Sequence, residues 1–181
     1  IRLLYEILGV IAMWCALKCR QGKAEEVMTS YRRNISEEIL RDIFVFTYDR
    51  MRRYEGSWHL ERHPMFPNYV FLETEDLKSL YRELKAHREI ASVLDEKNSA
   101  PVSYSLRKRA FLRVLCGKEH HLEMSEGYIR DGMTHVIRGP LMGMERRIRR
   151  IDRHKRIASV AVPDGNQGRL VTVGLEITAK N

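Results

Sequence analysis

The pattern of apolar residues changes sharply near residue 125, and this change limits what the chain can fold into. Before it, short apolar strands alternate with segments whose apolar residues recur at helical spacing. After it, short strands follow one another without a helix, separated by Gly132, Gly139-Pro140, Gly143 and Asp164-Gly165. A chain of 181 residues can hold one medium domain or two small ones. The sequence therefore predicts two domains of different architecture.

The first part predicts an α+β domain over residues 13–115. Its expected order is strand, helix, hairpin, strand, helix, strand, helix, and helices packed on one face of a mainly antiparallel sheet suit that order. Thr74 is the expected N-cap of the middle helix. The expected elements are a strand at Trp14–Cys19, a helix through Val27, Met28, Tyr31 and Ile35, a hairpin at 43–63, a strand after Pro67, a helix through Leu77, Leu80, Tyr81 and Leu84, a strand at Ile90–Leu94 and a helix from Ser105.

The second part predicts a small β-barrel over residues 126–181, after a polar linker at 116–125. The expected strands are Thr134–Ile137, Glu145–Ile151, Ile157–Val162 and Arg169–Val173.

Residues 1–12 are apolar, which raises the question of a targeting segment. The run carries Glu6, no small-x-small cleavage site follows it, and it is shorter than the about 20 residues of a membrane-spanning helix. Since Met13 resembles a start residue, we expect residues 1–12 to be an N-terminal extension and the protein to have no membrane partner.

The sequence contains no motif of a common enzyme class, neither a phosphate-binding loop nor HExxH nor GxSxG. The one metal-like cluster is Cys116 with His120 and His121, to which Cys15 and Cys19 could be added; it lacks the close ligand pairs of zinc sites. We therefore expect no catalytic residues, no metal and no cofactor. A metal-dependent enzyme around Cys116 and His120 is kept as an alternative.

A basic run between Glu145 and Ile157 is the strongest functional signal. It places seven cations in thirteen residues, and residues 126–181 carry eleven Lys and Arg against six Asp and Glu. Because like charges repel on so small a domain, a polyanionic partner is favoured over a merely solvated face. The same region has one aromatic residue, Tyr128, so phosphate and shape recognition of an RNA hairpin is expected rather than base stacking. The predicted nucleic-acid contacts are Arg146, Arg147, Arg149, Arg150, Arg153, Lys155 and Arg156.

Three segments together resemble the NusG family of transcription factors. They are MWCALKCRQGKAEEV from residue 13, MFPNYVFLE from residue 65, and GPLMGME from residue 139 followed by RRIDRHKR. The resemblance implies an NGN-like N-domain, a C-terminal KOW domain with an SH3-like barrel, and a bacterial, monomeric protein. Three cysteines in a chain of this length form no disulfide framework, so we also expect reduced thiols in a cytoplasm. The stretches IRRIDRHKRIA and VTVGLEI are most similar to the LoaP branch, whose members are antiterminators.

The resemblance also implies partners and the residues that bind them. RNA polymerase would be bound at its clamp helices through an apolar patch that maps onto Trp14, Phe66, Pro67, Tyr69 and Phe71. In the RfaH branch a basic loop contacts nontemplate DNA, and the matching positions here are Lys18, Arg20 and Lys23.

Three functions follow from these observations. The first is a processive antiterminator that binds polymerase and an RNA hairpin; the second is an RfaH-like factor bound to nontemplate DNA; the third is a KOW-type ribosome- or RNA-binding module. Two departures from the family pattern indicate a specialised paralogue. They are Arg146 in place of a KOW glycine, and Gly165-Asn166-Gln167-Gly168 in place of a Phe-Gly that docks a ribosomal protein and Rho.

Overall fold

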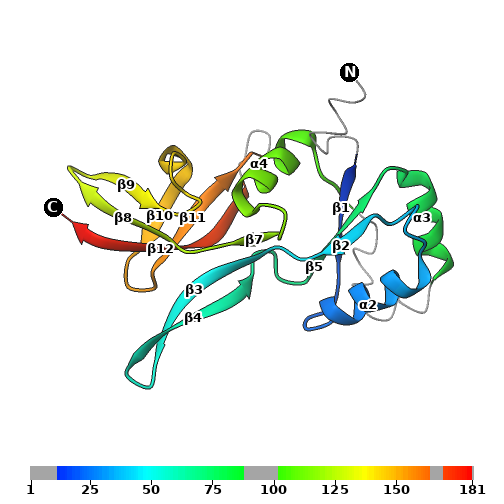
Figure 1. Cartoon of the computed structure of the whole chain (residues 1–181), viewed down its shortest axis with the longest axis horizontal. Helices are drawn as coiled ribbons and strands as arrows, with labels where there is room; N and C mark the ends of the chain where they lie inside the picture. Colours follow the sequence, from blue (N-terminus) through cyan, green and yellow to red (C-terminus); the bar gives the residue numbers. More distant parts are fainter. Residues whose placement is uncertain (1–11, 88–101, 164–168, 181) are drawn as a thin grey trace. The chain divides into compact units, whose positions relative to one another are not determined.

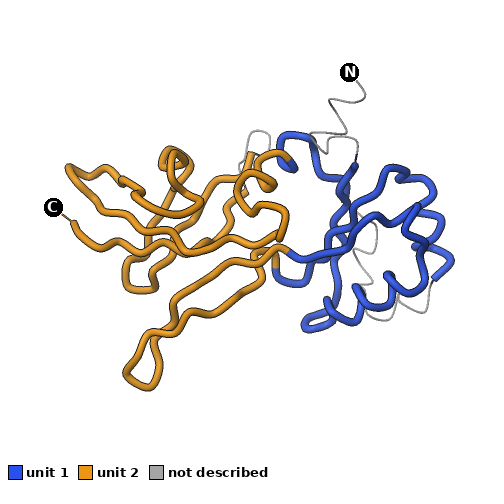
Figure 2. The backbone as a smooth tube through the Cα atoms, viewed as in Figure 1, with its two compact units in different colours: residues 1–45, 67–109 blue, residues 46–66, 110–181 orange. Residues whose placement is uncertain are grey.

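The computed structural model describes residues 12–87, 102–163 and 169–180 of the chain (Figure 1). The chain divides into two compact units, which are coloured separately in Figure 2. Unit 1 comprises residues 1–45 and 67–109, and unit 2 comprises residues 46–66 and 110–181. The mixed α+β fold predicted from the sequence is confirmed.

Unit 1 is built on a four-stranded sheet with the order β2-β5-β1-β6, in which all neighbouring strands are antiparallel. One face of this sheet packs against the two helices α2 and α3, and the strands alternate so that Cys15, Leu17, Val70 and Leu72 point into this core. The elements are β1 (Met13–Lys18), α2 (Ala24–Asn34), β2 (Asp42–Phe44), β5 (Tyr69–Thr74), α3 (Leu77–Ala86) and β6 (Val102–Ser103).

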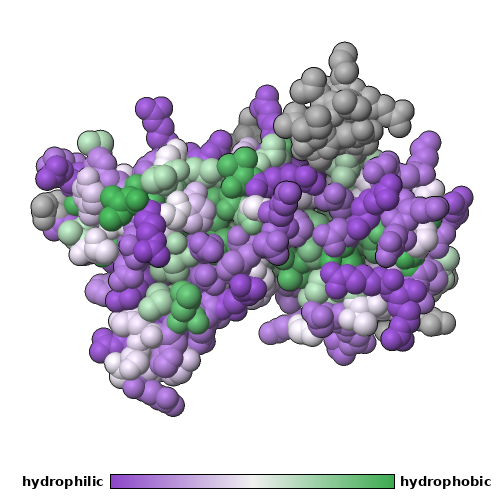
Figure 3. Space-filling model, in the orientation of Figure 1, coloured by the Kyte–Doolittle hydropathy of each residue, from purple (hydrophilic) through white to green (hydrophobic). Residues whose placement is uncertain are grey.

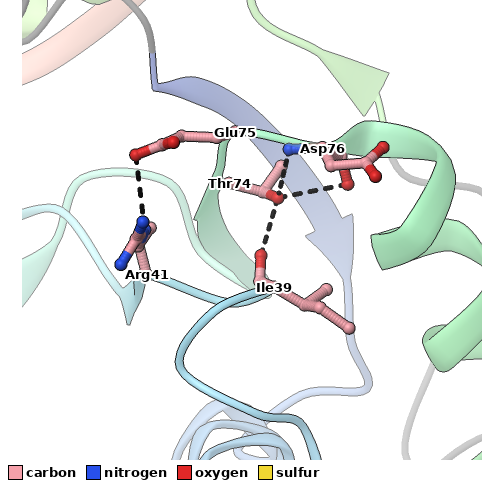
Figure 4. A network of polar contacts seen from close by, with 5 residues as sticks. All are labelled: Ile39, Arg41, Thr74, Glu75 and Asp76. Atoms are coloured by element: carbon pink, nitrogen blue, oxygen red, sulfur yellow. Dashed lines mark hydrogen bonds and ion pairs between the residues drawn. The ribbon is translucent and has the colours of Figure 1, made fainter.

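The end of β5 is fixed by a polar network (Figure 4). The buried Thr74 hydroxyl donates to the carbonyl of Ile39 over 2.6 Å and accepts from the backbone N–H of Asp76. Asp76, not the predicted Thr74, is the N-cap of α3, because its carboxylate accepts from the backbone N–H groups of Lys78 and Ser79. Thr74 is instead used to hold the loop before β2.

Unit 2 contains a three-stranded and a five-stranded sheet, with the orders β4-β3-β7 and β10-β11-β12-β8-β9. In the larger sheet β12 runs antiparallel to β11 and parallel to β8. The elements are β3 (Thr47–Tyr54), β4 (Ser57–Pro64), β7 (His121–Leu122), β8 (Ser125–Arg130), β9 (Met133–Arg138), a 3₁₀ turn η2 (Glu145–Arg147), β10 (Ile148–Asp152), β11 (Ile157–Val162) and β12 (Arg169–Lys180); helix α4 (Leu106–Cys116) belongs mostly to unit 2.

The β3–β4 hairpin closes with a two-residue turn at Glu55-Gly56, where both residues have positive φ. This backbone matches the right-handed twist of the two strands, and glycine at the second position is the preferred residue for it.

The hairpin is tied to the larger sheet of unit 2. A Cβ atom built on Gly174 of β12 would lie 2.3 Å from the carbonyl oxygen of Asp49 in β3, so β3 passes over β12 at a point where only glycine fits. The His121 ring bridges Thr47 and Asp49: Nδ1 lies 2.8 Å from the Thr47 hydroxyl, and Nε2 lies 3.1 Å from the Asp49 carboxylate.

Several local predictions differ from the structure. The strand expected from residue 43 is interrupted after Phe44, so that β2 joins the sheet of unit 1 and β3 starts the hairpin of unit 2. The expected linker at 116–125 contains β7, which pairs with β3. The strand expected at 90–94, residues 1–11 and the loop at 164–168 lie outside the described residues. Within the described part of the chain, no helix is long and apolar enough to cross a membrane.

Candidate nucleic-acid interface

The basic run lies on consecutive elements of unit 2: η2, β10, the turn at 153–156 and the first residue of β11. Strand β10 is an edge strand of the five-stranded sheet, paired only with β11 among the described strands. Hydrophilic residues dominate the face of the molecule seen in Figure 3. An edge strand with arginines is protected from pairing with another chain, and its side chains remain available to a partner.

A β-bulge in β10 determines how its arginines point. Ile148 pairs with Val160 and Arg150 with Ser159, so two residues of β10 oppose one residue of β11. Simple alternation would send Arg149 and Arg150 to opposite faces. In the structure both residues are exposed, while Ile148 and Ile151 are half-buried. The bulge therefore presents two adjacent guanidinium groups to solvent.

The seven predicted cations differ in what they already contact. Arg147 packs over the ring of Phe111, and Lys155 pairs with Asp152 at 3.7 Å. Arg156 pairs with Glu176 at 3.0 Å and stacks on Trp58. The remaining four are exposed and have no ion pair or side-chain hydrogen bond with any residue that the structure describes: Arg146, Arg149, Arg150 and Arg153.

The two acidic residues of the run shape its turns. The Glu145 carboxylate accepts from the backbone N–H groups of Val136 and Gly143, each at 3.3 Å. Hydrogen bonds from its own backbone N–H and from these two groups lower the pKa of Glu145. The backbone N–H of Lys155, 3.0 Å away, together with the nearby positive charge lowers the pKa of Asp152. Both acids therefore stay ionised at neutral pH and hold the backbone.

The predicted polymerase contacts are less accessible than expected. Trp14 and Phe71 are fully buried on the sheet face of unit 1 opposite to α2 and α3, where both rings contact Phe44. Phe66 is 8% exposed. Side-chain surface therefore remains mainly at Pro67, which is exposed, and Tyr69, which is half-buried.

Of the three positions matched to a DNA-contacting loop, Lys18 is the half-buried last residue of β1, and the other two lie in the loop between β1 and α2. Arg20 and Lys23 are both exposed. The Lys23 ammonium forms an ion pair with Glu26, one turn into α2, at 2.5 Å. This pair neutralises part of the positive charge of the loop.

The cysteines and histidines of the alternative metal site have other roles. All three cysteines are buried, and burial raises the pKa of Cys15 to about 11 and that of Cys116 to about 12. His120 stands edge-on to Phe46, and His121 bridges β7 and β3. Within the described ranges no group of three or more His, Cys, Asp or Glu residues could hold a metal ion.

One contributor to this surface was not predicted from the sequence. Trp58, near the end of the β3–β4 hairpin, carries the Arg156 guanidinium 3.9 Å from its ring centroid. The two residues are 98 positions apart, and no local pattern links them. The sequence showed only that an aromatic residue, Trp58, follows the hairpin turn. It did not show which residue the indole ring contacts.

Comparison with known proteins identifies the family that this chain matches. The family model described as "Transcription termination factor nusG" matches residues 12–111, more than half of the chain. Thirteen chains of solved structures also match. One of them, described as "Domain interaction in Thermotoga maritima NusG", is 20% identical, covers 92% of this chain and 94% of its own length, and has a TM-score of 0.48. The comparison with curated proteins returned no match.

Proposed function

The chain belongs to the NusG family of transcription factors, and from that premise we propose that it is a processive antiterminator of the LoaP kind. Its N-terminal region would bind RNA polymerase, and its C-terminal region would bind a structured leader RNA. Proteins of this family bind RNA polymerase and are not enzymes. The family match at residues 12–111 supports the polymerase half of the proposal.

The pair of exposed arginines at the β10 bulge carries the RNA half of the proposal. Arg149 and Arg150 lie side by side, and no described acidic group pairs with either of them. Guanidinium groups bind phosphate with two parallel hydrogen bonds, which suits the backbone of a folded RNA. Arg146 and Arg153 extend the same charge on both sides of the pair.

The strand order of unit 2 supports a KOW-type, SH3-like barrel as the scaffold. The five strands follow the order β10-β11-β12-β8-β9. Four of them are short, and the long β12 pairs antiparallel with β11 along its first half and parallel with β8 along its second half. A small barrel of this kind exposes turns and edge residues while it buries alternate positions. Among the buried positions are Val160, Val173 and Leu175.

Binding of the full chain to transcribed leader RNAs tests the proposal. Arg149→Gln/Arg150→Gln removes two charges from the bulge, and Lys78→Gln/Arg82→Gln removes two exposed charges from α3 as a matched control. Each phosphate contact contributes a slope of about −0.9 to the dependence of log affinity on log salt. For two lost contacts, we expect the slope of log affinity against log salt to be shallower by about 1.8 in the Arg149→Gln/Arg150→Gln variant and unchanged in the control. Equal RNA affinity of the bulge variant and the parent would refute RNA binding by this segment.

A second candidate function is an RfaH-like contact with nontemplate DNA. The exposed Arg20 favours it, while the Lys23–Glu26 pair weakens it. Arg20→Gln should then reduce crosslinking to nontemplate DNA in a transcription complex and leave leader RNA binding unchanged.

A further inference from the structure

The β3–β4 hairpin is part of the same compact unit as the basic run at 145–157, although the two lie about a hundred residues apart in the sequence (Figure 2). Gly174 lets β3 pass close over β12, and the Asp49–His121 pair fixes the base of the hairpin. The side chains of the hairpin therefore have defined positions relative to β10 and β11.

The contact between Arg156 and Trp58 brings the β10–β11 turn against the hairpin near its tip. The Arg156 guanidinium lies 3.9 Å from the Trp58 ring centroid and pairs with Glu176 of β12. Arg156 is therefore engaged in contacts within unit 2. Its ion pair neutralises Glu176, which would otherwise repel phosphate. Arg153 and Lys155 of the same turn remain exposed.

The pairing of the hairpin strands assigns its arginines to faces. Arg53 is the cross-strand partner of Trp58, so its side chain is on the face that meets the turn. Arg52 is the partner of His59 and points to the other face, where it forms an ion pair with Glu61 at 3.7 Å. Arg53 is exposed and has no ion pair with any described residue.

We propose that the nucleic-acid surface is composite and continues from β10 and the β10–β11 turn onto one face of the β3–β4 hairpin, with Arg53 as an additional phosphate contact. This inference rests on the proposed RNA-binding function and extends it to a part of the chain within the family match at residues 12–111. The partner is the phosphate backbone of a folded RNA. The proposed surface includes the exposed Arg153, which belongs to the turn that joins β10 to β11.

Arg52 and Arg53 give a matched pair of variants, since they are adjacent and exposed but lie on opposite faces. RNA binding of the full chain is measured over a series of salt concentrations for Arg53→Gln, Arg52→Gln and Arg53→Lys. We expect Arg53→Gln to bind more weakly and to lose about 0.9 of the salt slope. Arg52→Gln should keep the parental slope, and Arg53→Lys should keep most of it because the charge remains.

The outcomes separate this inference from the proposed function. If Arg149→Gln/Arg150→Gln weakens RNA binding and Arg53→Gln does not, the composite surface is overturned and the proposed function stands. If the bulge variant binds RNA as the parent does, the proposed function fails. Equal losses for Arg52→Gln and Arg53→Gln would overturn the assignment to one face. Preference for duplex DNA over the leader RNA in a competition assay would overturn the RNA partner.

Discussion

The Arg156 guanidinium lies 3.9 Å from the ring centroid of Trp58, which joins the turn before β11 to the hairpin strand β4. The same guanidinium pairs with Glu176 in β12. One side chain thus links the β10–β11 turn to two strands of unit 2, β4 and β12. The basic run consequently combines arginines that stabilise the fold with arginines that are available to a partner.

Arg156→Ala should destabilise unit 2. Loss of a cation–π contact and an ion pair at a partly buried position is worth about 1–2 kcal/mol of the free energy of unfolding. Urea unfolding followed by near-ultraviolet circular dichroism measures this value. Arg150→Ala, at an exposed position of the same segment, is the control and should change it by less than about 0.5 kcal/mol. A stable Arg156→Ala variant that has lost RNA affinity would instead make Arg156 a ligand contact.

Gly174→Ala should separate the hairpin from β12. The new methyl carbon would lie 2.1 Å from the Met124 sulfur and 2.3 Å from the Asp49 carbonyl oxygen, and the second of these atoms belongs to the backbone. Overpacking of this kind costs about 1–3 kcal/mol. Amide hydrogen exchange should show faster exchange in β3 and β4, whereas Thr172→Ala on the same strand should leave the hairpin protected. Unchanged protection in Gly174→Ala would mean that the close approach is not maintained.

The free energy of unfolding should fall in acid, because two carboxylates that accept backbone hydrogen bonds in turns become protonated. The pKa of Glu145 is lowered from 4.5 and that of Asp152 from 3.8 by backbone hydrogen bonds to their ionised forms. A lowered pKa in the folded state means that the stabilisation is complete above the unfolded pKa. It is lost as the pH falls through the lower, folded pKa. Thermal unfolding from pH 7 to pH 2 measures the effect.

Glu145→Gln tests the acid effect at one position. Its melting temperature should be lower than that of the parent at pH 7 and should approach it at low pH, where the parental carboxyl is protonated. A constant difference between the two proteins across the whole range would show that the charge of Glu145 is not involved.

The three cysteines should be unreactive in the folded protein. Burial raises the pKa of Cys15 to about 11, that of Cys116 to about 12, and also that of Cys19. Because the thiolate is the reactive form, alkylation at pH 8 should be slow and should become rapid in urea. Mass spectrometry of iodoacetamide-treated protein counts the modified thiols. Rapid modification of Cys116 before unfolding would reopen the alternative of a metal site around Cys116 and His120.

Much of the fold could be predicted because its signals are local. The apolar run of β5, the helical spacing of Val27, Met28 and Tyr31, and the glycine-separated strands after residue 125 depend on neighbouring residues alone. The basic run was likewise visible in the sequence. The family match at residues 12–111 supports the resemblance that rests on the motifs from residues 13 and 65.

The remaining features depend on contacts between distant residues. Strand alternation could not show the bulge that exposes both Arg149 and Arg150, because its position depends on pairing with Val160 and Ser159. The pairing of Arg156 with Trp58 and Glu176 spans most of the chain. The aromatic motif predicted exposed anchors, but Phe71 pairs with residues of both β1 and β2 and is buried.

The two aromatic residues of β5 should therefore respond differently to substitution. Phe71 is fully buried and contacts the rings of Phe44 and Tyr104, so Phe71→Ala should lower the free energy of unfolding by about 3–5 kcal/mol. Tyr69 is half-buried at the start of the strand, opposite Lys18. If Tyr69 anchors RNA polymerase as the resemblance implies, Tyr69→Ala should fold normally and weaken polymerase binding by about 2 kcal/mol.

Parallel measurements separate these effects. Urea unfolding gives the stability of each variant, and biolayer interferometry with immobilised core polymerase gives its affinity. Tyr69→Phe is the control, because it keeps the ring and removes only the hydroxyl; its polymerase affinity should stay close to the parental value. A Tyr69→Ala protein that is folded and binds polymerase as tightly as the parent would place the polymerase contact elsewhere in unit 1, with exposed Pro67 as the next position to substitute.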